Sequence, residues 1–170
     1  MKSLKYIIPV FLISLVFISC EKKDYPKGVT ELEHHYYAIF VPNNNTGVTV
    51  TRNQAALVKF PVQFYSTFVR DYDAIAKYVV VTGGITGPAA RGVDFDVVDK
   101  NGVVIPPLSD TTYTMKFPQA KQAMDTIYIK LLNNPAPGVR KFEIQMLDNI
   151  TSQFDVDIFS TAYRRPVTIN

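Results

Sequence analysis

Three aspartates beside a turn are the side chains of this sequence best suited to acid–base chemistry. Asp94 and Asp96 would lie on one face of an extended strand, where paired carboxylates can share general acid and base roles. Aspartate is also common in turns, because its carboxylate accepts hydrogen bonds from nearby backbone N–H groups. We favour this structural role: Asp94 closes a corner of the chain, and Asp99 flanks a turn at Asn101 and Gly102.

The two histidines give little support for a metal site. His34 and His35 are neighbours, and neighbours on a strand point to opposite faces, so the two cannot easily bind one ion. A zinc site needs three or four converging ligands. An EF-hand calcium loop with Gly102 at its sixth position would need ligands at Val97 and Leu108, whose side chains carry no oxygen. We therefore expect no metal ion and no other cofactor.

Motifs for nucleophilic catalysis and phosphate binding are also lacking. The sequence contains no Gly-x-Ser-x-Gly elbow. No Lys-Ser or Lys-Thr pair follows the glycine-rich run from Gly83 to Pro88, and Pro88 would break the helix that a phosphate-binding loop requires. The sequence therefore predicts a protein that is not an enzyme.

Exposed tyrosines are the residues that could contact a ligand, and the candidates are Tyr36, Tyr37 and Tyr128. Tyr36 and Tyr37 are neighbours on a predicted strand, so one of them points outward, and Tyr128 lies opposite the apolar Ile127 and Ile129. An exposed tyrosine ring can stack on a sugar and present its hydroxyl to water. The competing interpretation is that these rings form cross-strand pairs that support the sheet. The chain has no tryptophan, which weakens the case for glycan binding.

Cys20, the only cysteine, follows a segment typical of an export signal. That segment has Lys2 and Lys5 near its start, then an apolar stretch, and the small Ser19 directly before Cys20. The apolar stretch covers about 14 residues, fewer than the roughly 20 of a membrane-spanning helix. The arrangement resembles a bacterial lipoprotein signal peptide, in which residues 1–19 are removed and the thiol of Cys20 is lipidated. The resemblance implies a membrane anchor that palmitate labelling would detect.

Without its leader the chain has the size of one domain. Removal of residues 1–19 leaves 151 of the 170 residues, enough for a single core. Residues 20–32 are polar and contain a proline and a glycine, and we interpret them as a tether to a domain of residues 33–170. Loss of two lysines lowers the formal charge from +3 to +1. We interpret Arg164–Arg165 as a solvated strand end and expect no nucleic-acid partner.

Apolar and polar residues alternate in short runs, the period of strands with one buried face. Strands are expected at about residues 36–41, 56–65, 78–82, 94–100, 103–105, 113–117, 127–131, 142–146 and 161–169. Helical periodicity is scarce, and turn residues separate the runs. The sequence predicts an all-β fold with two packed sheets.

Three local features refine this pattern. Pro61 cannot donate a hydrogen bond to a neighbouring strand, so its strand is expected at a sheet edge or with a bulge. Asn101–Gly102 indicates a hairpin with a type I′ turn, in which both central residues have positive φ. A helical turn is expected within residues 69–76.

From Ala90 onward the order of motifs resembles a Calx-beta domain. The matching stretches are Ala90–Phe95, Tyr113–Pro118, Thr126–Leu131, Phe142–Leu147 and Pro166–Ile169, roughly the positions of a corner, a turn and three later strands of the family. The resemblance implies an immunoglobulin-like antiparallel β-sandwich of 7–8 strands. A similar arrangement occurs in uncharacterised Gram-negative surface lipoproteins that accompany glycan-uptake systems.

Some Calx-beta domains bind Ca²⁺ through acidic loops, and this chain departs from that pattern. Asn133–Asn134 stand where the family often has an aspartate pair, and Arg140–Lys141 stand where it has an acidic residue. Ca²⁺ requires several oxygen ligands with compensating negative charge. The resemblance therefore extends to the fold and not to the metal site.

Together these features predict a non-enzymatic lipoprotein, anchored through the lipid on Cys20 to the outer membrane, on its periplasmic or its surface side. The outer membrane is favoured because Glu21, and not aspartate, follows Cys20. We expect an extracytoplasmic binding module, accessory to glycan capture. The alternative is a structural or adhesion module that docks a protein partner through a sheet edge or its loops.

Overall fold

The structure, a computed structural model, describes residues 33–170, so the predicted leader, Cys20 and the tether lie outside the described residues. The strands are β1 (His35–Phe40), β2 (Val48–Val50), β3 (Val58–Tyr65), β4 (Ala74–Val81), β5 (Phe95–Val98), β6 (Thr112–Phe117), β7 (Ala123–Leu131), β8 (Arg140–Leu147), β9 (Asn149–Ile150), β10 (Asp155–Asp157) and β11 (Arg164–Ile169). A 3₁₀ turn, η2 (Pro118–Ala120), connects β6 to β7. No helix among residues 33–170 is long and apolar enough to cross a membrane.

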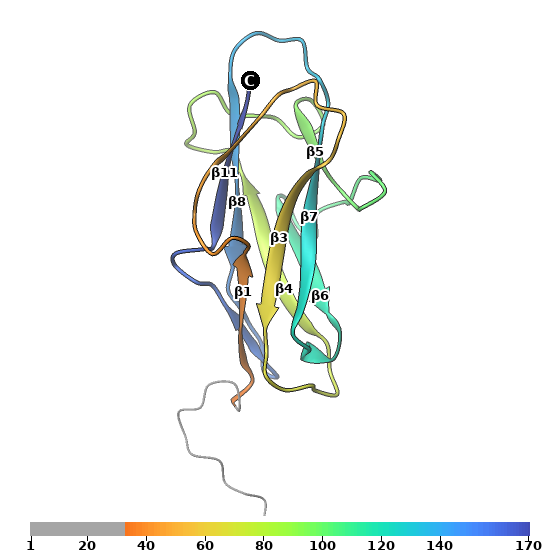
Figure 1. The fold of residues 1–170 in the computed structure, drawn as a ribbon, viewed down its shortest axis with the longest axis vertical. Helices are drawn as coiled ribbons and strands as arrows, with labels where there is room; N and C mark the ends of the chain where they lie inside the picture. The colour runs from red at the N-terminus through yellow and green to blue at the C-terminus, as the bar shows by residue number, and fades with distance from the viewer. Residues whose placement is uncertain (1–32) are drawn as a thin grey trace, which may run out of the picture.

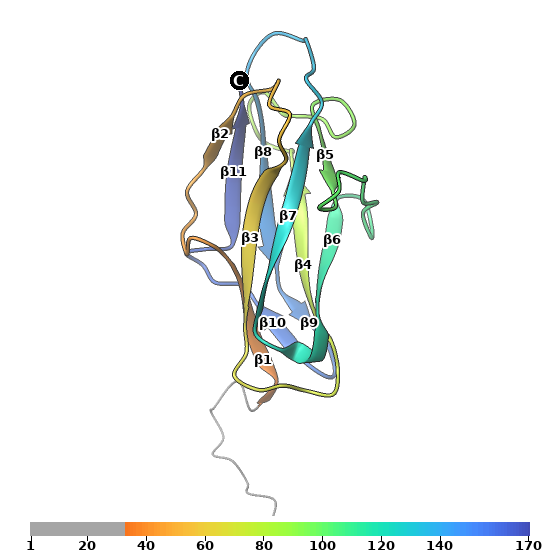
Figure 2. The same ribbon diagram turned by 45° about the vertical axis from the view of Figure 1, so that its right-hand side comes forward.

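Two sheets pack face to face and confirm the predicted all-β sandwich (Figures 1 and 2). The six-stranded sheet has the order β5-β7-β3-β1-β10-β9, and the five-stranded sheet has the order β2-β11-β8-β4-β6. Eight strands have four residues or more, and β2, β9 and β10 have two or three. Most neighbours are antiparallel, while β1 pairs with β10 and β11 with β2 in parallel.

Aromatic rings from both sheets meet in the core. Phe95 of the six-stranded sheet stacks on Phe142 of the other with ring centroids 4.1 Å apart, and Phe64 stacks on Phe117 at 4.5 Å. The alternation predicted for β3 is confirmed, since its buried and solvent-facing residues alternate along the whole strand. Burial of these large rings is a major source of stabilisation in a domain without disulfides.

Pro61 marks neither a sheet edge nor a bulge, so that prediction was wrong: the register of β3 with β7 runs unbroken through the pair of Pro61 with Thr126. β3 lies inside its sheet, between β1 and β7. The register pairs Phe40, the last residue of β1, with Val62, and the N–H of Val41 donates to the carbonyl of Pro61 at 2.9 Å. Because N–H and C=O of one strand residue point to the same side, the N–H that proline lacks would face the position where β1 ends. Pro61 therefore removes little of the backbone hydrogen bonding between β1 and β3.

Two further local predictions need correction. Residues 69–76 contain no helical turn: a loop leads directly into β4, which begins at Ala74. At the predicted hairpin, Gly102 has φ of +83° whereas Asn101 does not have positive φ, so the turn is not of type I′. Instead Gly102 donates its N–H to the carbonyl of Asp99 at 3.0 Å, and the Asp99 carboxylate accepts the N–H groups of Asn101 and Val103.

Of the pair Arg164–Arg165, only Arg164 is exposed to solvent. Arg164 is exposed, but Arg165 is 3% exposed, because consecutive residues of β11 point to opposite sides. The buried guanidinium of Arg165 donates to the carbonyls of Pro42 and Asn44 and lies 4.9 Å from the ring centroid of Phe40. The prediction of a solvated strand end was therefore wrong for Arg165, which ties the loop after β1 to β11.

Candidate functional site

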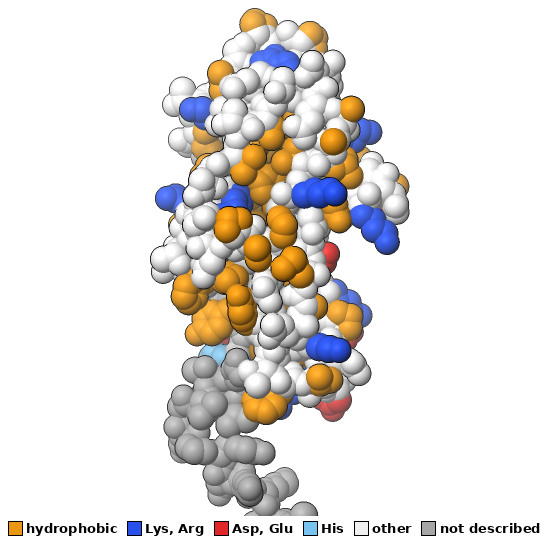
Figure 3. Space-filling model, viewed as in Figure 1, with side chains coloured by type: hydrophobic (Ala, Val, Ile, Leu, Met, Phe, Trp, Pro, Cys, Tyr) orange, Lys and Arg blue, Asp and Glu red, His pale blue; other side chains and the backbone are white. Residues whose placement is uncertain are grey.

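The outward side of the six-stranded sheet carries several aromatic side chains. Tyr37 of β1 and Tyr65 of β3 lie opposite each other in the register, and Tyr128 of β7 lies opposite Lys59 of β3. We call this surface the outer face; it consists of Tyr37, Ile39, Lys59, Pro61, Gln63, Tyr65, Met124, Thr126 and Tyr128. Figure 3 shows apolar side chains gathered over these strands. Two of the three tyrosines singled out from the sequence therefore share one surface.

An aromatic groove occupies one end of the outer face. It has a volume of about 350 Å³ and is lined by Tyr37, Ile39, Asn43, Tyr65 and Phe159. The ring of Phe159 meets that of Tyr37 edge-on, with centroids 6.1 Å apart. Tyr65 and Phe159 are exposed large apolar residues. Tyr37 lies opposite Tyr65 in the register, and its ring contributes to a surface hollow of a size suited to small ligands.

Tyr36 points into the sandwich, and it is not available to a ligand on the outer face. Its side chain is 1% exposed and its ring lies 5.2 Å from that of Phe64. Its hydroxyl lies 2.7 Å from the hydroxyl of Tyr72 and accepts a hydrogen bond from Nε of Arg70 at 3.3 Å. Of the neighbouring pair, Tyr37 is therefore the outward residue, and the candidate role of Tyr36 in binding is corrected to a role in the core.

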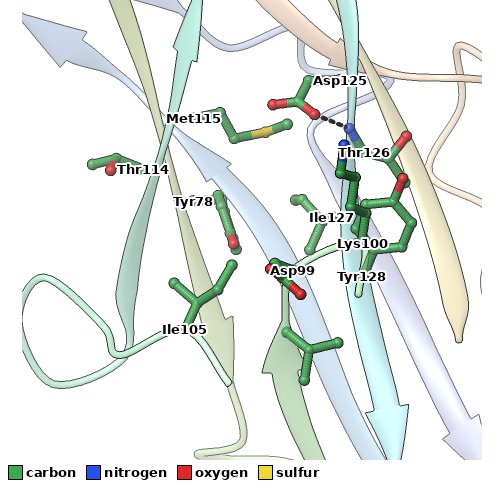
Figure 4. Close-up of a pocket in the computed structure, with 11 residues that line it drawn as sticks. Tyr78, Asp99, Lys100, Ile105, Thr114, Met115, Asp125, Thr126, Ile127 and Tyr128 are labelled. Atoms are coloured by element: carbon green, nitrogen blue, oxygen red, sulfur yellow. Dashed lines mark hydrogen bonds between the residues drawn. The ribbon is translucent and has the colours of Figure 1, made fainter. Parts of the chain in front are cut away.

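A second hollow, the edge hollow, opens where the two sheets separate between β6 and β7 (Figure 4). It measures about 340 Å³ and is lined by Tyr78, Val98, Asp99, Lys100, Ile105, Thr114, Met115, Asp125, Thr126, Ile127 and Tyr128. Figure 4 shows Tyr78, Met115 and Ile127 directed into the hollow, with Tyr128 on the other side of β7. Tyr128 therefore presents its ring to the outer face and contributes to the rim of this hollow.

Tyr78 is a buried tyrosine that lines the edge hollow. Burial raises the pKa of Tyr78 above its ordinary value, and the nearby Tyr113 and Asp125 raise it further. The Tyr78 ring stacks on that of Tyr113, with centroids 5.2 Å apart. The hydroxyl is therefore neutral at physiological pH and can donate a hydrogen bond but cannot act as a base.

The aspartates do not converge into an acid–base pair. The Asp94 carboxylate accepts hydrogen bonds from the N–H of Ala90 and from the side-chain amide of Asn134, both at 2.7 Å, which confirms that it closes a corner. Asp96 lies opposite Lys130 in the register of β5 and β7. Backbone hydrogen bonds from Val103 and Asn101 lower the pKa of Asp99, which is thereby held as an ionised turn residue.

The loop that carries Asn133–Asn134 is held by an arginine from another part of the chain. Nη1 of Arg52 donates to the carbonyl of Asn134 at 3.0 Å and to that of Ala136 at 2.5 Å, and Nη2 donates to the carbonyl of Gly138 at 2.7 Å. The amide of Asn134 donates to Asp94, which an aspartate at this position could not do. The asparagine therefore has a structural partner in this fold.

The two histidines have different surroundings and do not converge. Nε2 of His35 lies 3.2 Å from Asp155 and its Nδ1 lies 3.5 Å from Asp157, so the carboxylates flank the ring from different sides. Nδ1 of His34 lies 2.5 Å from the hydroxyl of Tyr72. Among residues 33–170 no cluster of three histidine, cysteine, aspartate or glutamate side chains could hold a metal ion.

The surroundings of His34 predict a pH-dependent contribution to stability. Burial and the nearby Arg70 lower the pKa of His34, and burial raises the pKa of Tyr72. The neutral hydroxyl of Tyr72 therefore donates a hydrogen bond to the neutral ring of His34. Because the folded pKa lies below that of the unfolded chain, near 6.5, this contribution is complete above pH ~6.5 and is lost as the pH falls. We expect the unfolding free energy to fall between pH 7.5 and pH 5.5, and less so in His34→Gln, as denaturant titrations can measure. Equal pH dependence in both proteins would contradict this assignment.

No family model matches the sequence, and no curated protein resembles it significantly. Among solved structures, the chain is similar to the apo-form Calx CBD1 domain, with 14% identity over 79% of this chain and 97% of that chain and a TM-score of 0.49. It is also similar to a chain of a complex between CaDoc0917 and CaCohA2, with 14% identity, coverages of 79% and 99% and a TM-score of 0.41. A third is the human F-spondin reeler domain, with 6% identity, coverages of 79% and 89% and a TM-score of 0.36. At such identities the likeness concerns the fold alone.

Proposed function

We propose that this protein is a lipid-anchored binding module of the cell envelope that captures a glycan chain on its outer face. The observation that carries the proposal is the placement of Tyr37, Tyr65 and Tyr128 on one solvent-facing sheet surface, with Phe159 beside them. Exposed aromatic rings stack on the C–H faces of sugars, and the hydroxyls of tyrosine remain free for hydrogen bonds at the edge. Exposed apolar surface on a soluble protein often marks a site of interaction.

The dimensions of the outer face fit an extended oligosaccharide. Lys59, opposite Tyr128, and Tyr65, opposite Tyr37, are six residues apart on β3, which corresponds to about 20 Å along the strand. Several sugar units can span that length. Gln63 lies between the two ends and Asn43 lines the groove, so polar groups that can bind sugar hydroxyls accompany the rings.

We expect the domain to migrate more slowly in native gels that contain a polysaccharide it binds. Tyr37→Ala and Tyr128→Ala should each weaken the affinity about tenfold, since a lost aromatic stacking contact costs roughly 1 to 1.5 kcal/mol. Affinity electrophoresis over a panel of polysaccharides measures the effect as the ratio of mobilities with and without glycan.

Phe68→Ala is the matched control, because Phe68 is an exposed aromatic residue outside the outer face. It should leave the retardation unchanged. A glycan that retards the two tyrosine variants as strongly as the unsubstituted protein would place binding elsewhere. Unchanged mobility on every polysaccharide would count against glycan capture.

A second candidate function is docking of a protein partner, and one loop favours it. Residues 103–108 follow β5 and expose Val103, Val104, Ile105 and Leu108 together. A group of exposed apolar side chains in a loop is typical of a protein contact surface. If no glycan retards the protein, a photo-crosslinker in place of Leu108 would identify the partner that this alternative requires.

The proposed location rests on the leader and Cys20. A thiol lipidated at the first residue of the mature chain would hold the domain at a membrane surface through the tether of residues 20–32. Placement at the outer membrane, on either side, is part of the proposal. A glycan-binding face at that location would capture polymers before their transport into the cell.

A further inference from the structure

Apolar side chains project from the end of the sandwich at which the described chain begins. Phe68 and Val69, in the loop between β3 and β4, are 41% and 59% exposed, and Ile150 of β9 is 74% exposed. We call Phe68, Val69 and Ile150 the tether-end tip. The register places the start of β1 at the same end, because Tyr37 pairs with Tyr65 and β1 runs antiparallel to β3. Figure 1 shows β1 beginning beside this loop.

Hydrogen bonds hold the loop that exposes Phe68 and Val69. The hydroxyl of Ser66 donates to the carbonyl of Phe68 at 2.8 Å, and the N–H of Arg70 donates to the carbonyl of Gln119 at 2.7 Å. The guanidinium of Arg70 lies 5.2 Å from the ring centroid of Phe68. These contacts hold both ends of the apolar pair, so the loop presents its side chains to the surroundings in a defined orientation.

We propose that the tether-end tip inserts into the surface of the phospholipid bilayer that holds the lipid on Cys20. The inference rests on the proposed anchoring of the chain. The 13 residues from Cys20 to Leu32 can span at most about 45 Å, and they join the domain at the end that carries the tip. The bilayer is therefore the partner that this end meets first, and an aromatic and two aliphatic side chains suit its interface.

Charge near the tip is mixed, which indicates an apolar contact and not an electrostatic one. Arg70, which follows the apolar pair, is itself followed by Asp71, and Ile150 lies opposite Asp155 in the register of β9 and β10. Lys116 is paired with Asp73 at 2.6 Å. Attraction to anionic lipids needs clustered basic residues, so the tip should insert into neutral and anionic bilayers to a similar extent.

The orientation that follows is specific. The outer face extends from the tip along β1, β3 and β7. Tyr37, opposite Tyr65, lies at the tip end, and Tyr128 lies about 20 Å further along the strands. A domain standing on its tip would therefore hold Tyr37 close to the bilayer surface and Tyr128 further from it. The loop that ends at Val139 lies at the opposite end of β7 and β8, furthest from the bilayer (Figure 1).

The absence of tryptophan from the chain allows a direct test. The full lipidated protein would be reconstituted into phosphatidylcholine vesicles as a Phe68→Trp variant, with Val139→Trp as the matched control at the opposite end. We expect blue-shifted emission for Phe68→Trp and quenching by brominated phosphatidylcholine that exceeds that of Val139→Trp by roughly a factor of two or more. Addition of phosphatidylglycerol should change neither result.

Flotation of the vesicles separates the two ways in which the inference can fail. Protein that floats with the vesicles while Phe68→Trp and Val139→Trp give equal emission and quenching overturns tip insertion and leaves the anchor intact. Protein that does not float overturns the anchor at Cys20 and the insertion with it. Insertion that appears only with phosphatidylglycerol would overturn the apolar mode of contact.

Discussion

Arg165→Met is expected to lower the unfolding free energy by about 3 kcal/mol, and the melting temperature by about 10 °C. The substitution removes the guanidinium that donates to the carbonyls of Pro42 and Asn44 and leaves both acceptors beneath a methionine that cannot donate. Truncating one partner of a buried, charge-assisted hydrogen-bond set costs more than the set contributes to stability, because the groups left behind remain desolvated. Urea titrations followed by circular dichroism would measure the change.

The adjacent residue supplies the control. Arg164→Met should cost less than about 1 kcal/mol, since Arg164 is exposed and its nearest carboxylate, that of Glu143, is 4.0 Å away. Similar losses for the two variants would mean that Arg165 contributes as a surface charge and not as a buried donor. A secondary effect on binding is expected for Arg165→Met alone, because the loop it ties down carries Asn43 of the aromatic groove.

Alternation within a strand could be read from the sequence because it is decided locally. The apolar face of β3, from Val58 to Phe64, points inward as predicted, and the same holds for the alternating residues of β6, β7 and β8. Successive side chains on a strand must point to opposite sides, so every second residue faces the core and the residues between them face solvent. The corner at Asp94 was likewise predictable, since its partner Ala90 is only four residues away.

Features that depend on distant partners could not be predicted in this way. β2, β9 and β10 are too short to show alternation. β2 and β10 form because β11 and β1 offer edges to pair with, and β9 pairs in turn with β10. The position of Pro61 inside a sheet depends on where β1 ends. The burial of Arg165 depends on carbonyls more than 120 residues earlier in the chain.

The candidate site likewise contains residues that local alternation predicts and residues that depend on distant partners. The alternation of side chains along each strand predicted that Tyr128 and one of Tyr36 and Tyr37 point outward. Only the register of β1, β3 and β7 places Tyr37 and Tyr128 on one surface. Tyr65 was missed as a candidate. It lies an even number of residues from Lys59 and Gln63, so the alternation along β3 could have placed it on the outward side. Phe159 lies outside the strands, and no periodic signal marks it.

The predicted lipid on Cys20 has consequences for stability as well as for location. Cys20 is the only cysteine, so a lipidated chain has no thiol left with which to form a disulfide. The domain must then be stabilised by core packing and buried hydrogen bonds, such as those of Phe95 with Phe142 and of Arg165. Cys20 is predicted to begin the tether that precedes the domain of residues 33–170, so its replacement should leave the melting temperature unchanged.

Cys20→Ser is therefore expected to abolish incorporation of a palmitate analogue and to release the protein from the membrane fraction, without loss of folding. Serine offers no thiol for the thioether that holds the lipid, and a remaining apolar leader of about 14 residues is too short to span a bilayer. Phe17→Leu is the matched control in the same segment: it exchanges one large apolar side chain for another, leaves the thiol of Cys20 in place and should retain labelling. Metabolic labelling followed by fractionation measures both variants. Label that persists in Cys20→Ser, or its absence from the unsubstituted chain, would overturn the anchor and the membrane orientation inferred from it.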